Sequence, residues 1–139
     1  MSEALYHDAL VRRARTAFGK GRLPGASATA TVDNPLCGDR VTIDLVAQDG
    51  HIAAIGHQVR GCLLCEAAAA TIAEYCGGAD KGTLDAISAA ARTLMAEGGE
   101  LPPQWQCLEI FRPVHQAKSR RDCVLLPFEA LRRAASAVL

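Results

Sequence analysis

The chain has 139 residues, with 15 basic and 15 acidic side chains, and half of its residues are hydrophobic. This length and composition predict a single domain over residues 1–139 with one apolar core. The zero net charge argues against a nucleic-acid-binding protein, and no apolar stretch approaches the roughly 18 residues that a membrane span needs. We see no basic segment followed by an apolar run at the amino terminus, so we expect a cytoplasmic protein with mostly reduced cysteines.

The first half of the chain predicts one helix followed by strands. Helical spacing of apolar residues predicts a helix over residues 2–18, with Ser2 as its N-cap. Asp49-Gly50 is typical of a hairpin turn, and by simple alternation His57 falls on the more polar face of the strand after it. The predicted strands cover residues 27–32, 40–48 and 51–59.

After Gly61 the apolar period changes to that of helices. The polar, basic stretch 114–122 indicates a loop, and Pro127 fits the first turn of the helix that follows. The predicted helices cover residues 62–76, 84–96, 105–111 and 125–138. This order of elements favours an α+β fold, in which several helices cover a small antiparallel sheet of about three strands.

Three cysteines that are far apart in the sequence carry the functional argument. Cys37 and Asp39 are two residues apart, so in an extended backbone both side chains point to the same side. Cys62 opens a helix, where unpaired N–H groups favour a thiolate. Cys123 follows basic residues that include Arg120. If they converge, three thiolates and a carboxylate would form a zinc or labile iron site, or a place that receives sulfur.

Each of these residues also has a plainer interpretation. Asp39 can be a turn residue beside an incidental Cys37, and the other two cysteines can be small buried residues. Cys65 completes a C-x-x-C pattern with Cys62, which can indicate a redox pair. The βαβ context of such pairs is missing here, so Cys65 is alternatively a reserve ligand or a core residue.

The remaining cysteines and the histidines give weaker signals. Cys76 lies roughly 21 Å along the predicted helix from Cys62, at about 1.5 Å per residue, so the two cannot share one metal ion. Cys107 is expected in the core. Three histidines are expected at the solvated surface rather than at a metal: His51, His57 and His115.

Two segments together resemble a known family. Asn-Pro-Leu-Cys-Gly-Asp-Arg at 34–40 precedes a strand pair, and Val-Arg-Gly-Cys at 59–62 opens a helix. Both are similar to the iron–sulfur assembly scaffolds of the IscU and NifU amino-terminal family. The long gap between Cys62 and Cys123 resembles the SufU branch, which carries an insertion before its third cysteine.

The resemblance implies a site built from Cys37, Asp39, Cys62 and Cys123. SufU-like members bind Zn²⁺ and accept sulfur from a SufS-like cysteine desulfurase. On that pattern we expect a zinc-dependent sulfurtransferase, with Cys37 as the sulfur acceptor and Arg120 in contact with the persulfide or the partner. The alternative is a non-enzymatic scaffold that assembles a [2Fe–2S] cluster on the same residues and passes it to apo iron–sulfur proteins.

The sequence departs from the family at several points. Asp122 stands where IscU-like proteins carry a histidine, and Cys65 stands where small polar residues are usual. Leu101-Pro102-Pro103 lies too far upstream of Cys123 to be the family's chaperone-binding motif, so we interpret it as a helix start. A third hypothesis, from another class, is a structural or adaptor domain with its cysteines in the core and no metal.

Overall fold

The computed structural model describes residues 7–36 and 38–139, and it confirms the predicted α+β fold. The strands β1, β2 and β3 form one antiparallel sheet in that order. In chain order the elements are α1 (Asp8–Thr16), β1 (Ala28–Asn34), β2 (Asp39–Gln48), β3 (His51–Arg60), α2 (Leu63–Tyr75), α3 (Lys81–Glu97), the 3₁₀ segments η2 (Pro103–Gln116) and η3 (Lys118–Arg120), and α4 (Arg121–Val138). None of the helices in these ranges is long and apolar enough to cross a membrane.

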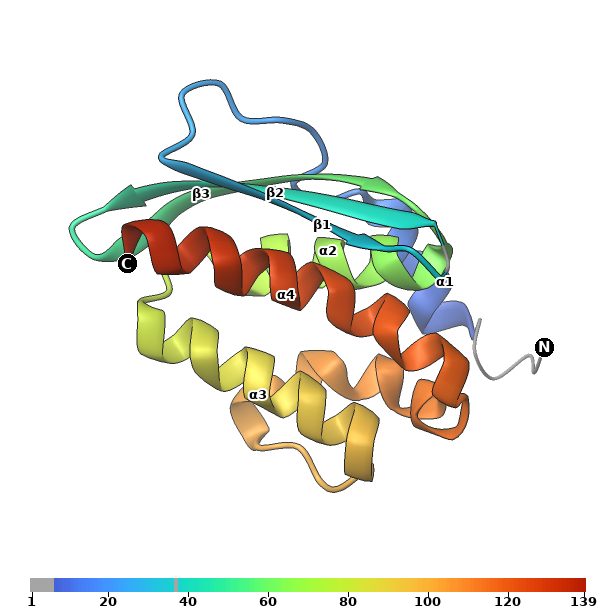
Figure 1. Cartoon of the computed structure of the whole chain (residues 1–139). Helices are drawn as coiled ribbons and strands as arrows, with labels where there is room; N and C mark the ends of the chain where they lie inside the picture. The colour runs from blue at the N-terminus through green and yellow to red at the C-terminus, as the bar shows by residue number, and fades with distance from the viewer. Residues whose placement is uncertain (1–6, 37) are drawn as a thin grey trace.

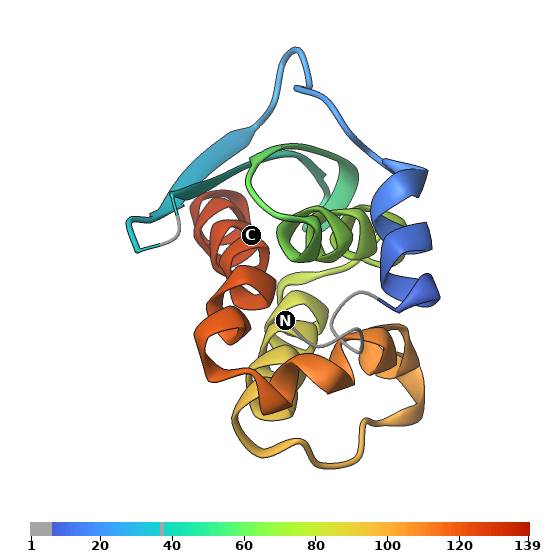
Figure 2. The same cartoon turned by 90° about the vertical axis from the view of Figure 1, so that its right-hand side faces the viewer.

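The helices are arranged in two layers on one face of the sheet. Helix α4 contacts β1 and β2, while α2 contacts β3 and α1 packs against α2. Figure 1 shows the sheet above α2 and α4, with α3 and the orange η2 segment forming a lower layer. The view in Figure 2 shows α1 beside α2 at the edge of this arrangement. The core extends from the inner face of the sheet through the first layer of helices to α3 and η2.

Both terminal helices differ from their predicted bounds. Ser2, the predicted N-cap, lies outside the described residues, and α1 begins at Asp8 with His7 as its N-cap. The stretch 114–122, predicted as a loop, is helical except at Ala117, which separates η2 from η3. Two backbone hydrogen bonds hold it, from the Ala117 N–H to the Val114 carbonyl and from the Arg120 N–H to the Ala117 carbonyl. The Arg121 side chain adds a third, since its Nε donates to the His115 carbonyl at 2.9 Å. Consequently α4 begins at Arg121, and Pro127 lies inside the helix rather than in its first turn.

A β-bulge explains why His57 is buried. The register of β2 against β3 shifts between Val46 and Ala47, so that Ile43 is paired with His57. Opposite residues of a strand pair share a face, which places His57 on the helix-covered side with Ile43. Its side chain is 4% exposed, and its Nε2 bonds to the Phe18 carbonyl at 2.7 Å. The predicted solvated position was wrong because simple alternation along 51–59 does not survive an inserted residue.

The outer face of the sheet carries a buried carboxylate. Asp44 is fully buried beneath the connection between α1 and β1, the blue segment that runs above the sheet in Figure 1. Arg22 Nε donates to it at 2.6 Å, Thr29 Oγ1 at 2.5 Å and the Leu23 N–H at 3.0 Å. Burial alone would raise the pKa of Asp44, but these hydrogen bonds outweigh it and hold the pKa below its ordinary value.

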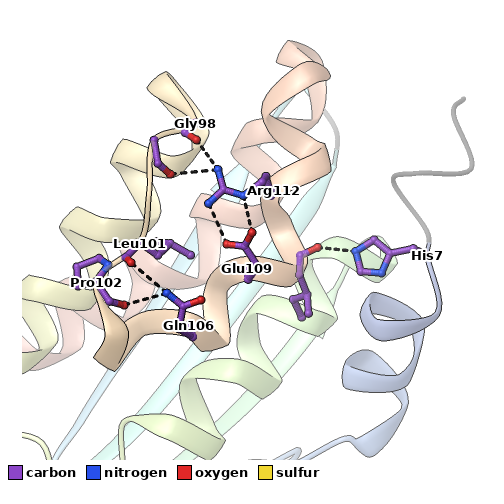
Figure 3. Close-up of polar contacts among 9 residues, drawn as sticks. His7, Gly98, Leu101, Pro102, Gln106, Glu109 and Arg112 are labelled. Carbon is purple, nitrogen blue, oxygen red and sulfur yellow. Dashed lines mark hydrogen bonds and ion pairs between the residues drawn. The ribbon is translucent and has the colours of Figure 1, made fainter.

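The segment after α3 is fixed largely by bonds to backbone carbonyls, as Figure 3 shows. The Arg112 guanidinium donates to the carbonyls of Gly98 and Gly99 and pairs with Glu109 at 2.6 Å. Gln106 donates to the Leu101 carbonyl at 3.0 Å. Pro103 is the first residue of η2, so the interpretation of the Leu-Pro-Pro sequence as a helix start is confirmed.

Candidate metal centre

Three residues from distant parts of the chain meet at one end of the sheet. Asp39 is the first residue of β2, Cys62 is the N-cap of α2, and Cys123 lies in the first turn of α4. One ligand atom from each lies within 4.8 Å of the other two. They are three of the four residues that the family resemblance implied. Cys37, the fourth, lies outside the described residues.

Asp39 is placed by the sheet and by a glycine. It pairs with Asn34 at the start of β2, and its side chain is on the helix-covered face of the strand, where it is 5% exposed. Gly61, in the turn between β3 and α2, lies directly against the carboxylate. A Cβ atom at Gly61 would be 2.7 Å from Oδ1 of Asp39. The absence of a side chain at residue 61 therefore makes room for this carboxylate.

Cys62 has the surroundings of a thiolate. It caps α2 in an extended conformation, and it is half-buried. Hydrogen bonds from the Cys123 thiol and then from the Cys65 thiol hold the pKa of Cys62 well below its ordinary value, with help from the N–H groups of Cys65 and Leu64. The helix dipole acts in the same direction.

Cys123 is the buried partner in this arrangement. Its side chain is fully buried, and its hydrogen bond to Cys62 raises the pKa of Cys123 to about 12. The charge of Arg120 acts in the opposite direction on this thiol. Arg120 is the half-buried residue just before α4, so its guanidinium belongs to the electrostatic environment of the site.

Cys65 also belongs to the site, a point that sequence reasoning left open. It is fully buried, and its Sγ donates to Asp39 Oδ2 at 3.3 Å and to the Cys123 carbonyl at 3.0 Å. Hydrogen bonding to Cys123 and Cys62 raises the pKa of Cys65. The available signal was the C-x-x-C spacing, since residues three apart on a helix are neighbours.

A proline explains why the Cys123 carbonyl can accept this hydrogen bond. In a regular helix that oxygen would bind the N–H four residues further on. Here that residue is Pro127, inside α4, and proline has no N–H to donate. The Cys65 thiol approaches the oxygen that the proline leaves free. Pro127 thus contributes to the site from a full turn away.

Among the described residues, Cys76, Cys107 and the histidines lie outside this group. Cys76 is at the opposite end of α2, where burial raises its pKa to about 12. Cys107, expected in the core, is half-buried and packs against it. His51 is exposed as predicted, and His115 bonds through Nδ1 to the Met95 carbonyl at 2.8 Å.

The chemistry of the converging atoms fits a metal ion. Thiolates and a carboxylate are ligands that zinc accepts, and in a tetrahedral site with Zn–S bonds of about 2.3 Å two ligand atoms are about 3.8 Å apart. The ligand atoms of Asp39, Cys62 and Cys123 are within 4.8 Å of one another, so each pair needs to approach by no more than about 1 Å. The half-buried position of Cys62 leaves one side of the site accessible.

Comparison with known proteins defines the class to which the chain belongs. Residues 5–138 match the family described as the NifU-like N terminal domain, and the chain belongs to this family of iron–sulfur cluster assembly scaffolds. Two relatives are the iron–sulfur cluster assembly scaffold proteins IscU 1 and IscU 2 of Archaeoglobus fulgidus. Each is 28% identical over 131 residues, which cover 94% of this chain and 74% of the relative.

Solved structures share the fold over nearly the whole length. A NifU-like protein (N-terminal) from Brucella abortus superposes with a TM-score of 0.91 at 28% identity, covering 98% of this chain and 95% of that chain. A putative iron–sulfur cluster assembly scaffold protein for the SUF system from Fervidobacterium islandicum has a TM-score of 0.87 at 21% identity, covering 97% and 99%. The second likeness concerns the fold alone.

Proposed function

We propose that the chain accepts sulfur from a SufS-like cysteine desulfurase during iron–sulfur cluster assembly, at a zinc site made of Cys37, Asp39, Cys62 and Cys123. The observation that carries this proposal is the convergence of Asp39, Cys62 and Cys123 within 4.8 Å. Membership of the scaffold family supports it. Bound Zn²⁺ would keep the thiols deprotonated and serve as a Lewis acid.

The residues take different roles in this proposal. An acceptor thiolate attacks the outer sulfur of the desulfurase persulfide and takes it as a new persulfide, which leaves the desulfurase cysteine as a thiolate. Cys37 remains the acceptor predicted from the sequence. Among the described thiols Cys62 is the best placed, because it is half-buried at a helix N-terminus. Asp39 is the oxygen ligand that exchanges most readily, and Arg120 contacts the persulfide or the partner.

The alternative is a scaffold that assembles a transient [2Fe–2S] cluster on the same residues and delivers it to apo iron–sulfur proteins. The names of the two Archaeoglobus fulgidus relatives favour it. Thiolate sulfur is also the usual protein ligand of such clusters. The two functions share a site and differ in the cargo that the site carries.

Metal analysis of the protein purified without added metal tests the site. We expect zinc in the unaltered chain and in Cys107→Ser, a control cysteine outside the group, and little zinc in Cys62→Ser or Cys123→Ser. Treatment with the desulfurase and cysteine should then add one sulfur atom to the chain, seen by mass spectrometry. Zinc binding that survives both ligand substitutions would contradict the proposal.

A second measurement separates the alternative. Anaerobic reconstitution with iron and sulfide should give the visible absorption of a [2Fe–2S] cluster if the chain is a scaffold, and the cluster should move to an apo-ferredoxin. A chain that takes sulfur from the desulfurase but forms no transferable cluster supports sulfur acceptance. A chain that forms the cluster but takes up no sulfur supports the scaffold.

A further inference from the structure

Sulfur delivered as a persulfide is not yet in the form that a cluster contains. The outer atom of a persulfide is sulfane sulfur, whereas the bridging atoms of an iron–sulfur cluster are sulfide. Each delivered atom therefore needs two electrons. We propose that Cys62 and Cys65 form a redox pair that supplies these electrons and releases the sulfur as sulfide. This inference rests on the proposed sulfur acceptance, with Cys62, the best placed of the described thiols, as the residue that carries the persulfide.

The two cysteines have the unequal exposure that such a pair uses. Cys62 is the half-buried N-cap of α2, and Cys65 is the third residue of that helix and is fully buried. Residues three apart on a helix are neighbours, and Asp39 lies beside both: its carboxylate is 3.3 Å from Cys65 Sγ, and one of its oxygens is within 4.8 Å of Cys62 Sγ. The Cys62 thiol can meet an incoming partner, whereas the buried Cys65 thiol can react only with groups inside the site.

A proton acceptor is already in contact with the inner thiol. Sγ of Cys65 donates to Oδ2 of Asp39 at 3.3 Å, and this carboxylate is itself buried. A thiol must lose its proton before it attacks another sulfur. Asp39 is therefore placed to take the Cys65 proton as the attack begins. In the described residues no comparable carboxylate contact is seen for Cys76 or Cys107.

The step balances without a further reactant. Sulfur of Cys65 attacks the inner sulfur of a persulfide on Cys62, a new Cys62–Cys65 disulfide forms, and the persulfide S–S bond breaks. The outer sulfur leaves with the bonding electron pair as hydrosulfide, which takes up the proton held by Asp39. The two cysteines are oxidised and the transferred sulfur is reduced. A dithiol reductant, small or protein-borne, must then restore the two thiols.

Cys123 is the competing thiol, because its Sγ also lies within 4.8 Å of Cys62 Sγ. Two observations favour Cys65. It is on the same helix as Cys62, so closing a disulfide moves no other element. Its thiol also reaches the Asp39 carboxylate. The experiment must therefore identify which cysteine joins Cys62.

In the test, the purified chain is loaded with sulfur by a cysteine desulfurase and free cysteine. The free cysteine is then removed under anaerobic conditions, and no reductant is added. The unaltered chain should release sulfide in equal amount to a Cys62–Cys65 disulfide found by non-reducing peptide mapping. Cys65→Ser and Cys65→Ala should keep the persulfide, with sulfide release at least about tenfold slower until dithiothreitol is added. Cys107→Ser should behave like the unaltered chain.

Serine is the decisive substitution because it keeps a donor to Asp39 but has no sulfur. Normal sulfide release by Cys65→Ser would overturn the redox role and leave Cys65 as a positioning residue. A Cys62–Cys123 disulfide accompanying that release would assign the pair to Cys123 instead.

A measurement without the desulfurase separates the failure of this inference from failure of the proposed function. The reduced chain is equilibrated in a glutathione redox buffer and mapped again, and we expect a Cys62–Cys65 disulfide. Its absence would overturn the pair, whatever the sulfur donor does. The second case is that the disulfide forms but the Cys65→Ser variant takes up no sulfur from the desulfurase. This result would overturn the proposed sulfur acceptance and the sulfide release, while the redox pair would stand.

Discussion

Asp39 and Asp44 are both buried carboxylates on β2, yet their surroundings differ in kind. Asp44 faces outward from the helices and receives hydrogen bonds from a guanidinium, a hydroxyl and a backbone N–H. Asp39 faces the helices and is held by the thiol of Cys65, which is a weak donor. A strongly bonded carboxylate has little to gain from a metal ion. A weakly held one can exchange its thiol contact for a metal.

The difference comes from strand geometry and from what covers each face. Successive side chains on a strand point to opposite sides, so an odd and an even position five residues apart lie on different faces. The connection carrying Arg22 covers Asp44, whereas α2 and α4 bring Cys62 and Cys123 to Asp39. The same residue type is thus bonded into the fold on one face and lies within 4.8 Å of two thiols on the other.

Alanine substitution of the two carboxylates, Asp44 and Asp39, should have the largest effects, on stability and on zinc binding respectively. Asp44→Ala leaves a buried hydroxyl and N–H without their acceptor, so we expect it to lower the free energy of unfolding by about 2–3 kcal/mol. Asp39→Ala should change that free energy by less than about 1 kcal/mol and weaken zinc binding by tenfold or more. Urea unfolding of the metal-free chains and chelator competition measure the two quantities.

The two variants are controls for each other. If the comparison is right, each variant changes one quantity and leaves the other nearly intact. Weaker zinc binding in Asp44→Ala, at a temperature where it is fully folded, would show that the two carboxylates are not separate in function.

A pair of glycines at the two ends of α2 gives a finer test. The Cβ of Gly61→Ala would lie 2.7 Å from Oδ1 of Asp39, so the carboxylate must move. We expect zinc affinity to fall about tenfold, the lower end of what changes around a metal ligand cost. Gly77→Ala meets nothing within 4 Å and should bind zinc like the unaltered chain. Equal affinities in the two variants would mean that the position of Asp39 does not matter.

Acid should weaken the fold through Asp44. The pKa of Asp44 is lower in the folded chain than its ordinary value of 3.8, so its contribution is complete above about pH 4. That contribution is lost as the pH falls through the folded pKa, because the unfolded state binds the proton first. The slope cannot exceed about 1.4 kcal/mol per pH unit for one proton. Urea unfolding between pH 5 and pH 2 should therefore show that the free energy of unfolding of Asp44→Asn falls less steeply with decreasing pH than that of the unaltered chain.

His57 should give the smallest effect, at higher pH. Burial lowers its pKa from 6.5, so the folded chain keeps the ring neutral while the unfolded chain gains a proton as the pH falls below that value. Stability should be complete above about pH 6.5 and decline below it, down to the folded pKa. His57→Gln should remove this part of the pH dependence. A variant whose curve between pH 7.5 and pH 5 still parallels the unaltered chain would contradict the assignment.

The fold was largely predictable because its signals are local. Alternation in 40–48, the Asp49-Gly50 turn and the helical period after Gly61 each depend on neighbouring residues. The errors arose where tertiary contacts decide. The extra residue Ala53, which has no partner on β2, turned His57 inward, and the bond from Arg121 to the His115 carbonyl helps hold a polar stretch in helical form.

The site was only partly predictable for a related reason. The family resemblance implied Asp39, Cys62 and Cys123, and the structure brings them together. Spacing alone could not say that Cys65 turns toward Asp39, since a buried cysteine in a core gives the same pattern. Nor does any local rule connect Pro127 with a thiol on another helix, because that contact exists only after α2 and α4 pack together.

Pro127 leaves the main-chain oxygen of Cys123 free to accept a hydrogen bond from a thiol on another helix. A survey that replaces only the side chains around Asp39 would never reveal it, because the oxygen belongs to every possible residue at position 123. Anyone grafting this cluster of thiols onto a different helical scaffold would have to transfer the interrupted helix as well as the cysteines. With an ordinary residue in place of the proline, the helix would reclaim the oxygen for its own hydrogen bonding and the buried thiol would lose its second anchor.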